Sequence, residues 1–166
     1  MGTVPRLCLD GPRVINSFGT CSAIHSPVPH PHQNQAISQE HSLGCAVACV
    51  ASRCGLAYRE ALGLFEQPEL AWIRGFYCVE VVEALRRGGL NYRLSGFIAE
   101  VHAVELLKIG TIVFVSRSEL YPFGHYLVRA AEGWMNSWIN FPEMISIQAG
   151  FQRSLPGAAE YILYEQ

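Results

Sequence analysis

The pattern of apolar and polar positions divides the chain into a helical part followed by a part rich in strands. Residues 45–54, "CAVACVASRC", are apolar on nearly every side, which predicts a helix enclosed by the rest of the domain. Gly55 suits the C-terminal end of that helix. Residues 58–67 and 78–88 predict two further helices, the second of them amphipathic, and a fourth is expected over 101–108.

Strand patterns dominate the second half of the chain. Glu132-Gly133 predicts a tight turn between two strands, in a register that pairs Arg129 with Asn136. Helices first and antiparallel strands afterwards indicate an α+β domain, with N-terminal helices packed on a C-terminal antiparallel sheet. Strands are expected over 91–97, 110–116, 124–131, 134–138, 143–148 and 159–165.

The first 38 residues carry no regular pattern, so we expect an irregular segment (1–38) ahead of one domain (39–166). Asp10-Gly11 is a hairpin-type turn signal, and the Pro-, His- and Gln-rich residues 26–35 cannot form a regular helix or a central strand. One interpretation of the segment is a flap over a cleft in the domain.

A metal-site interpretation of the same segment is weaker. Cys21, His25, His30 and His32 are four potential zinc ligands close together in the sequence. The prolines between them constrain the loop, and no Cys-x2-Cys or His-Glu-x2-His spacing appears. A solvated loop is therefore the expectation, with no metal.

Composition excludes several classes of protein. The 166 residues are 50% hydrophobic and 16% charged, with a net charge of −2, so a sizeable core is expected and nucleic-acid binding is not. No apolar run approaches the roughly 18 residues that span a bilayer, and no signal-peptide pattern is visible, so we expect a cytoplasmic protein without membrane insertion. Mostly reduced thiols are expected for Cys8, Cys21, Cys45, Cys49, Cys54 and Cys78.

Cys45 stands where a polar stretch gives way to the apolar helix. A helix N-terminus stabilises a thiolate through its dipole and its free N–H groups. Gly44, directly before it, is expected to allow close approach of a substrate backbone. Cys45 is therefore a candidate nucleophile, whereas Cys49, Cys54 and Cys78 are expected to be packing residues.

A thiol nucleophile needs an imidazole as its partner and as the acid for the leaving group. His125, at the head of the strand "HYLV", is the best placed, and Asn136 in the next strand is the candidate to hold its ring in one tautomer. In the predicted register Asn136 lies four residues along from His125, long for a direct hydrogen bond unless twist or a bulge closes the gap. His41 is too near Cys45 in sequence, and His102 is expected on a helix surface.

Gln39 six residues before the cysteine, followed by "GHYLV" and "MNSW", resembles the papain-fold cysteine peptidases. In that fold a Gln and the Cys backbone N–H form the oxyanion hole, Cys attacks, His acts as base and acid, and Asn orients His. The resemblance implies a Cys45–His125–Asn136 triad with Gln39 as oxyanion donor. It also implies that Trp138 shields the His–Asn contact from water.

The chain's size and the motif "Q…GCAVAC" look more like those of the bacteriocin-processing peptidases, which are compact papain-like domains that cleave leader peptides after Gly-Gly. The third residue of that family is usually Asp followed by Pro, at a longer spacing, so Asn140 in "INFP" is the alternative to Asn136. The resemblance implies thiol-dependent hydrolysis of a peptide or amide bond in a peptide or protein substrate, without a cofactor. Deamidation, acyl transfer to an amine, and a non-catalytic peptide-binding module are the alternatives. Neither the substrate nor the oligomeric state follows from the sequence.

Overall fold

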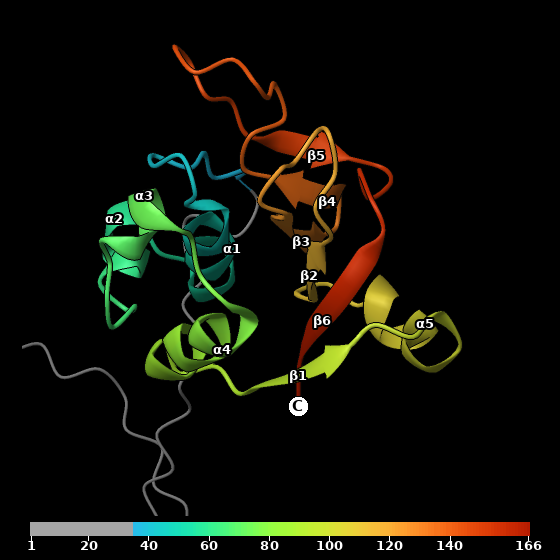
Figure 1. Ribbon diagram of the computed structural model, residues 1–166. Helices are drawn as coiled ribbons and strands as arrows, with labels where there is room; N and C mark the ends of the chain where they lie inside the picture. The colour runs from blue at the N-terminus through green and yellow to red at the C-terminus, as the bar shows by residue number, and fades with distance from the viewer. Residues whose placement is uncertain (1–34) are drawn as a thin grey trace, which may run out of the picture.

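A computed structural model describes residues 35–166. The expected hairpin-type turn, the flap and the four potential zinc ligands of the N-terminal segment lie outside the described residues. Within 35–166 the chain is α+β, with five helices and one six-stranded antiparallel sheet (Figure 1). The expected fold class, helices followed by an antiparallel sheet, is confirmed at this level.

The helices are mostly those that the apolar pattern predicts. α1 has the predicted bounds and ends at Gly55, whose φ of 66° lies in the left-handed region that glycine adopts without strain. The predicted second helix is shorter than expected, and α3 has no counterpart among the predictions. Over 35–166, no helix combines the length and apolar character needed to cross a bilayer. The bounds are α1 (Cys45–Cys54), α2 (Tyr58–Leu62), α3 (Leu70–Ile73), α4 (Cys78–Arg87) and α5 (Ala99–Leu107).

The sheet has the strand order β1-β6-β2-β3-β4-β5. The strand predicted over 143–148 is wrong: this stretch is an irregular loop, because Met144 and Ile145 are exposed and no core side chains hold them. β6 has the predicted bounds. The strands are β1 (Tyr92–Gly96), β2 (Ile112–Val115), β3 (His125–Ala130), β4 (Gly133–Asn136), β5 (Gly150–Gln152) and β6 (Ala159–Glu165).

The register between β3 and β4 also differs from the prediction. Asn136 pairs with Leu127 rather than with Arg129, since the turn consists of Ala131-Glu132. Asn136 therefore lies two residues along from His125 instead of four. Side chains of a strand alternate between the two faces, so His125 and Asn136 remain on the same face and come closer together than expected.

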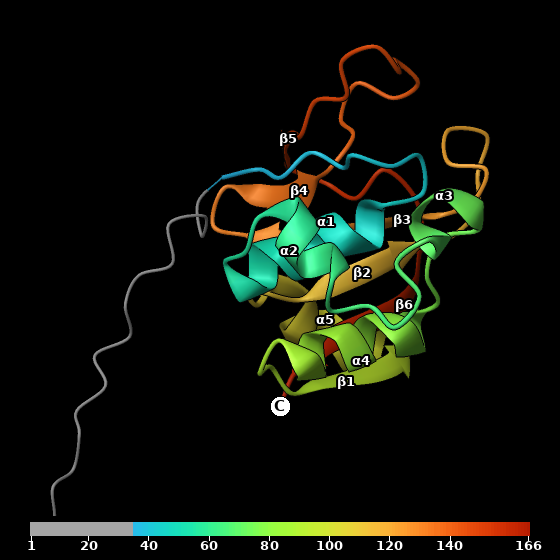
Figure 2. The same ribbon diagram turned by 90° about the vertical axis from the view of Figure 1, so that its left-hand side faces the viewer.

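Two apolar layers hold the domain together. Helices α1 to α4 cover one face of the sheet and α5 lies on the other, as the two views show (Figures 1 and 2). Helix α1 is the centre of the larger layer, and its residues 46–51 are fully buried. Facing the layer of α1 are Ile112, Tyr126, Val128, Met135 and Leu163. On the opposite face lie Val113, Val115, Leu127, Trp134 and Ile162.

Candidate active site

A cavity of about 360 Å³ lies at the end of the sheet where β3 begins and β4 ends, beside the start of α1. Both Cys45 and His125 line it, so the predicted nucleophile and base face one space from two different elements. Its polar wall also includes Gln39, Ser42 and Arg74. The apolar wall consists of Leu43, Phe76, Phe114, Tyr121, Pro122, Phe123, Tyr126, Trp138, Phe141 and Met144, with Gly75 and Gly124.

Cys45 is the first residue of α1. The first N–H groups of a helix have no carbonyl partner within it, so they can stabilise negative charge beside them. Burial raises the pKa of the Cys45 thiol to about 11, and hydrogen bonds from the backbone of Tyr126, Ala46 and Cys45 itself oppose this increase. The thiol is therefore neutral at pH 7 and needs a base within reach to become a nucleophile.

The structure explains the glycine at position 44 in a different way from the prediction. A Cβ atom at this position would overlap the hydroxyl of Tyr58, the first residue of α2. The missing side chain thus makes room for α2 against the start of α1. The close approach at Gly44 is made by Tyr58, from within the protein, and close approach of a substrate backbone stays a prediction.

His125 begins β3 and is 4% exposed. Gly124 before it has a φ of 74°, and a Cβ atom there would overlap the ring of Phe114, so the entry into β3 requires glycine. Burial lowers the pKa of His125 to about 4, and its hydrogen bond to Asn136 opposes this decrease. The ring is therefore neutral at pH 7 and able to accept a proton.

The hydrogen bonds of Asn136 define the tautomer of His125. Asn136 Oδ1 lies 2.8 Å from His125 Nε2 and accepts from the backbone N–H of Trp138 at 2.9 Å. A main-chain N–H can only donate, so the shared atom is the amide oxygen and Nε2 must carry a hydrogen. The lone pair of the neutral ring is then on Nδ1. Asn136 Nδ2 donates to Tyr121 Oη (3.0 Å) and to Gln152 Oε1 (3.1 Å).

The two candidates for the third residue have different partners. Asn136 contacts His125 directly, because of the register described above. Asn140 instead braces the loop that follows β4: its Nδ2 donates to the Ser146 carbonyl and its Oδ1 accepts from the Gln148 N–H, both at 2.9 Å. Of the two, Asn136 is the residue placed to orient the ring.

Gln39 is 3% exposed and lines the cavity. Its Nε2 donates to the carbonyls of His41 (3.0 Å) and Ser42 (3.1 Å), and its Oε1 accepts from Ser137 Oγ (2.9 Å). Both amide hydrogens are engaged, so Gln39 braces the loop that leads into α1. Its oxyanion role stays a prediction.

The ring that lies face to face with His125 is that of Tyr121, with 4.4 Å between centroids and 10° between planes. Trp138 packs edge-on against Phe141 at 4.8 Å, and its indole N–H donates to the Glu143 carbonyl. The shielding role of Trp138 stays a prediction. Tyr121 was missed by sequence reasoning because it lies in the irregular loop before β3, where no spacing marks it.

The other two described histidines have partners of their own. His41 Nδ1 lies 3.1 Å from Tyr58 Oη. The surface position predicted for His102 is wrong: it is 5% exposed. It is buried because α5 packs against the sheet, with the ring near Phe97 and Tyr164. Its Nδ1 accepts the N–H of Ile98 at 3.0 Å at the start of α5. Neither side chain lines the cavity.

The four described thiols are free. Cys49 is fully buried within α1, in agreement with its predicted packing role. Cys78 Sγ lies 3.2 Å from Tyr126 Oη. Cys54 is partly exposed at the end of α1. Among these four, Cys45 alone lines the cavity.

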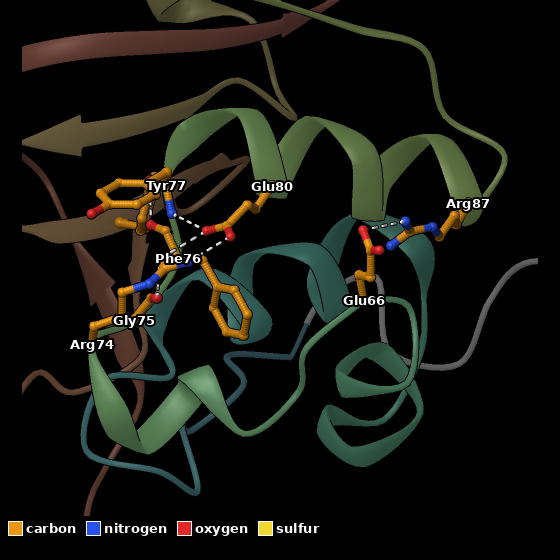
Figure 3. A network of polar contacts seen from close by, with 8 residues as sticks. Glu66, Arg74, Gly75, Phe76, Tyr77, Glu80 and Arg87 are labelled. Atoms are coloured by element: carbon orange, nitrogen blue, oxygen red, sulfur yellow. Dashed lines mark hydrogen bonds and ion pairs between the residues drawn. The ribbon is translucent and has the colours of Figure 1, made fainter.

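Arg74 contributes a charged side chain to the cavity wall, and this charge is balanced by Glu80 (Figure 3). The guanidinium donates to both carboxylate oxygens, at 2.7 and 3.0 Å, and lies over the Tyr77 ring. These bonds lower the pKa of Glu80, which also accepts the Tyr77 N–H at the start of α4. The pair therefore adds little net charge to the cavity.

The arrangement combines a neutral thiol at the start of a helix with a neutral imidazole whose lone pair is on Nδ1, two components of acyl transfer through sulfur. Within residues 35–166, no three His, Cys, Asp or Glu side chains lie close enough together to hold a metal ion. Comparison of the chain with protein-family models, with curated proteins and with solved structures finds no match. The chemistry of the site itself therefore carries the functional inference.

Proposed function

We propose that this protein is a papain-like cysteine hydrolase that cleaves a peptide or amide bond. In this proposal Cys45 is the nucleophile, His125 is the base and acid, and Asn136 orients His125. One observation carries it: Cys45 and His125 line the same cavity, while the bond from His125 Nε2 to Asn136 Oδ1 leaves Nδ1 as the basic nitrogen.

The placement of the three residues supports a papain-like architecture. Cys45 begins a buried helix packed on an antiparallel sheet, His125 begins β3, and Asn136 ends the neighbouring β4. The chain order Cys, His, Asn and the sequence "NSW" are similar to those of the papain fold. The compact size and the sequence around Cys45 favour the bacteriocin-processing group within the papain fold.

In the acylation step, His125 Nδ1 takes the Cys45 proton as the sulfur attacks the substrate carbonyl carbon. A C–S bond forms and the π electron pair moves to oxygen. The Cys45 backbone N–H donates to this oxyanion, and Gln39 Nε2 adds a second donor when one of its hydrogens leaves a loop carbonyl. A donor of this kind contributes about 3–4 kcal/mol to transition-state stability.

The tetrahedral intermediate then collapses. The C–N bond breaks, the amine leaves with the proton held on His125, and a thioester remains on Cys45. Water attacks this thioester while His125 Nδ1 accepts a proton from it, and the proton returns to the sulfur as the carboxylic acid departs. Asn136 keeps Nε2 protonated throughout, so that the same nitrogen, Nδ1, serves both steps.

The cavity favours a substrate with an uncharged, apolar side chain near the scissile bond. Its walls are largely aromatic, and the charge of Arg74 is balanced by Glu80. Its volume lies within the range of about 300–1,000 Å³ typical of small-ligand sites. An acidic or basic side chain would lose its hydration there without finding a free partner of opposite charge.

The test uses a panel of fluorogenic peptidyl amides that differ only in the residue before the amide bond: apolar, acidic or basic. We expect turnover of the apolar members, loss of turnover by at least about a thousandfold in Cys45→Ala, and a thioester adduct on Cys45 detected by intact-mass analysis. Cys54→Ala is the matched control on the same helix, and its activity should remain.

Product analysis in the presence of an amine nucleophile separates hydrolysis from deamidation and from transfer. Wild-type activity in Cys45→Ala would refute the mechanism. A chain with no turnover, in which iodoacetamide modifies Cys45 no faster than Cys54, would be a peptide-binding module instead. In that outcome the cavity has a binding role and the acyl chemistry is wrong.

A further inference from the structure

Tyr121 contacts both residues that the proposed mechanism uses on the sheet. Its ring lies parallel to the His125 imidazole, with 4.4 Å between centroids and 10° between planes. Its hydroxyl oxygen accepts a hydrogen bond from Asn136 Nδ2 at 3.0 Å. The side chain is buried, at 6% exposure, and also lines the cavity. One side chain thus contacts the ring and the amide that holds that ring.

Tyr121 is itself fixed by contacts that do not involve His125 or Asn136. Its backbone N–H donates to Ser118 Oγ at 3.1 Å, and its carbonyl accepts from the N–H groups of Ser118 and Gly124, both at 3.0 Å. Its ring also lies 5.6 Å from that of Phe141. The phenol is therefore held by its own loop and can serve as a fixed surface for the imidazole.

The two contacts constrain different motions. A parallel ring at this separation restricts tilting of the imidazole plane and excludes water from one of its faces. The hydroxyl, together with Gln152 Oε1, restricts rotation of the Asn136 amide about its terminal bond. Without these restraints, the orientation of His125 Nδ1 in the cavity that it shares with Cys45 would vary, and proton transfer is sensitive to such misplacement.

We infer that Tyr121 is a positioning residue for the reaction: it holds the His125 imidazole in the plane needed for proton transfer with Cys45 and keeps water from the His125–Asn136 hydrogen bond. The inference rests on the proposed function. The titratable side chains that share the cavity with the ring are Cys45 from α1, Arg74, Tyr121 and Tyr126, with Arg74 paired to Glu80. β4 contributes the uncharged Asn136, and the residue of β2 that pairs with His125 is the apolar Val115.

Two substitutions separate the contributions of the ring and the hydroxyl. Tyr121→Phe keeps the stacked ring and removes the acceptor for Asn136, so kcat/KM should fall by about 3–10-fold, the loss expected for one ordinary hydrogen bond. Tyr121→Leu removes both contacts, so kcat should fall by about 30–100-fold with a small change in KM. The acid limb of its pH profile should also move to higher pH, because water that reaches His125 reduces the desolvation that lowers its pKa.

Leu120→Ala is the control, since Leu120 lies on the same loop, is 45% exposed and does not line the cavity. Its kinetics should match the wild type. A folded Tyr121→Leu protein with wild-type kcat/KM and pH profile would overturn the inference. If Tyr121→Leu does not fold, Tyr121→Met, which also removes the ring and the hydroxyl, replaces it, and wild-type kcat/KM and pH profile in that variant overturn the inference. Activity that survives Cys45→Ala would instead refute the proposed function, so the two failures are distinguishable.

Discussion

Two histidines in different regions of the molecule are buried to nearly the same degree, yet their surroundings differ. His102, at the start of α5, accepts a hydrogen bond from Ile98, four residues before it, and its ring lies among aromatic side chains. His125, at the end of the sheet, bonds to Asn136 on a neighbouring strand and lines a cavity that it shares with Cys45. Burial of an imidazole alone therefore does not mark a site.

The two histidines differ in where the hydrogen-bond partner of the ring lies in the fold. The bond of His102 closes a turn within its own element, so the imidazole helps to define where α5 begins. The bond of His125 joins two strands and fixes the tautomer, which leaves the lone pair of Nδ1 able to accept a proton. A buried histidine becomes a candidate base when a distant partner holds one nitrogen and a cavity adjoins the ring.

The largest expected effect comes from removing each imidazole in turn. His125→Ala should lower kcat/KM by about a thousandfold or more, because both proton transfers of the proposed mechanism use this ring. His102→Ala should leave kcat/KM within about threefold and lower the free energy of unfolding, since it exposes a turn that the imidazole closes. Steady-state kinetics and urea unfolding of the two variants measure these changes.

Equal losses of activity in two folded variants would remove the distinction between the histidines. A loss in His102→Ala that tracks its fraction unfolded would leave the distinction intact. The comparison is sharpened by measuring the rate at which iodoacetamide modifies Cys45, which should fall in His125→Ala and stay unchanged in His102→Ala.

The second expected effect is on stability as the pH falls. The pKa of His125 is about 4 in the folded protein, against an ordinary value near 6.5, so the unfolded chain binds more protons between these two pH values. The free energy of unfolding should therefore decrease as the pH falls from 6.5 to 4, by at most about 3 kcal/mol from this group. Urea unfolding at several pH values measures the slope.

His125→Gln should remove this part of the pH dependence, while His102→Gln should leave it in place. A slope that is unchanged in His125→Gln would show that other groups cause it. It would also contradict the picture of a neutral ring at the end of the sheet.

The smallest of the three effects concerns the residue that orients His125. Asn136→Ala should lower kcat/KM by about 10–30-fold, because the imidazole remains in place but loses its fixed tautomer. Asn140→Ala, which removes loop contacts outside the ring's surroundings, should change kcat/KM by less than about threefold. The reverse ranking in kinetic assays would make Asn140 the functional residue and contradict the observed hydrogen bond.

Much of the fold follows from the sequence where a pattern has one physical cause. Helix α1 and strand β6 have the bounds predicted from their apolar runs, because the core buries those runs. Cys45 could be singled out as well, since it stands at the boundary between a polar stretch and a buried helix. The presence of a suitable histidine and asparagine at the rim of the sheet also follows from strand patterns.

The remaining features depend on contacts between distant segments. Gly133 was predicted to lie in the turn, but it lies within β4, where a Cβ atom would overlap the Gln152 carbonyl of β5. The predicted register between β3 and β4 is therefore shifted by two residues. Tyr121 gives no signal because its role depends on where its loop lies in space. The buried position of His102 depends likewise on the packing of α5 against the sheet.

The bond from the Trp138 backbone N–H to Asn136 Oδ1 has a consequence for how the site can evolve. Every residue except proline supplies this N–H, so almost any residue at position 138 would keep the amide oxygen of Asn136 on the side of His125. An aspartate at position 136 could keep both bonds to one oxygen and accept from the Tyr121 hydroxyl with the other, but the Gln152 amide would have to turn, because its Oε1 now accepts from Asn136 Nδ2. The backbone thus keeps the acceptor for His125 in place, whereas an acid at position 136 would also require a change at Gln152.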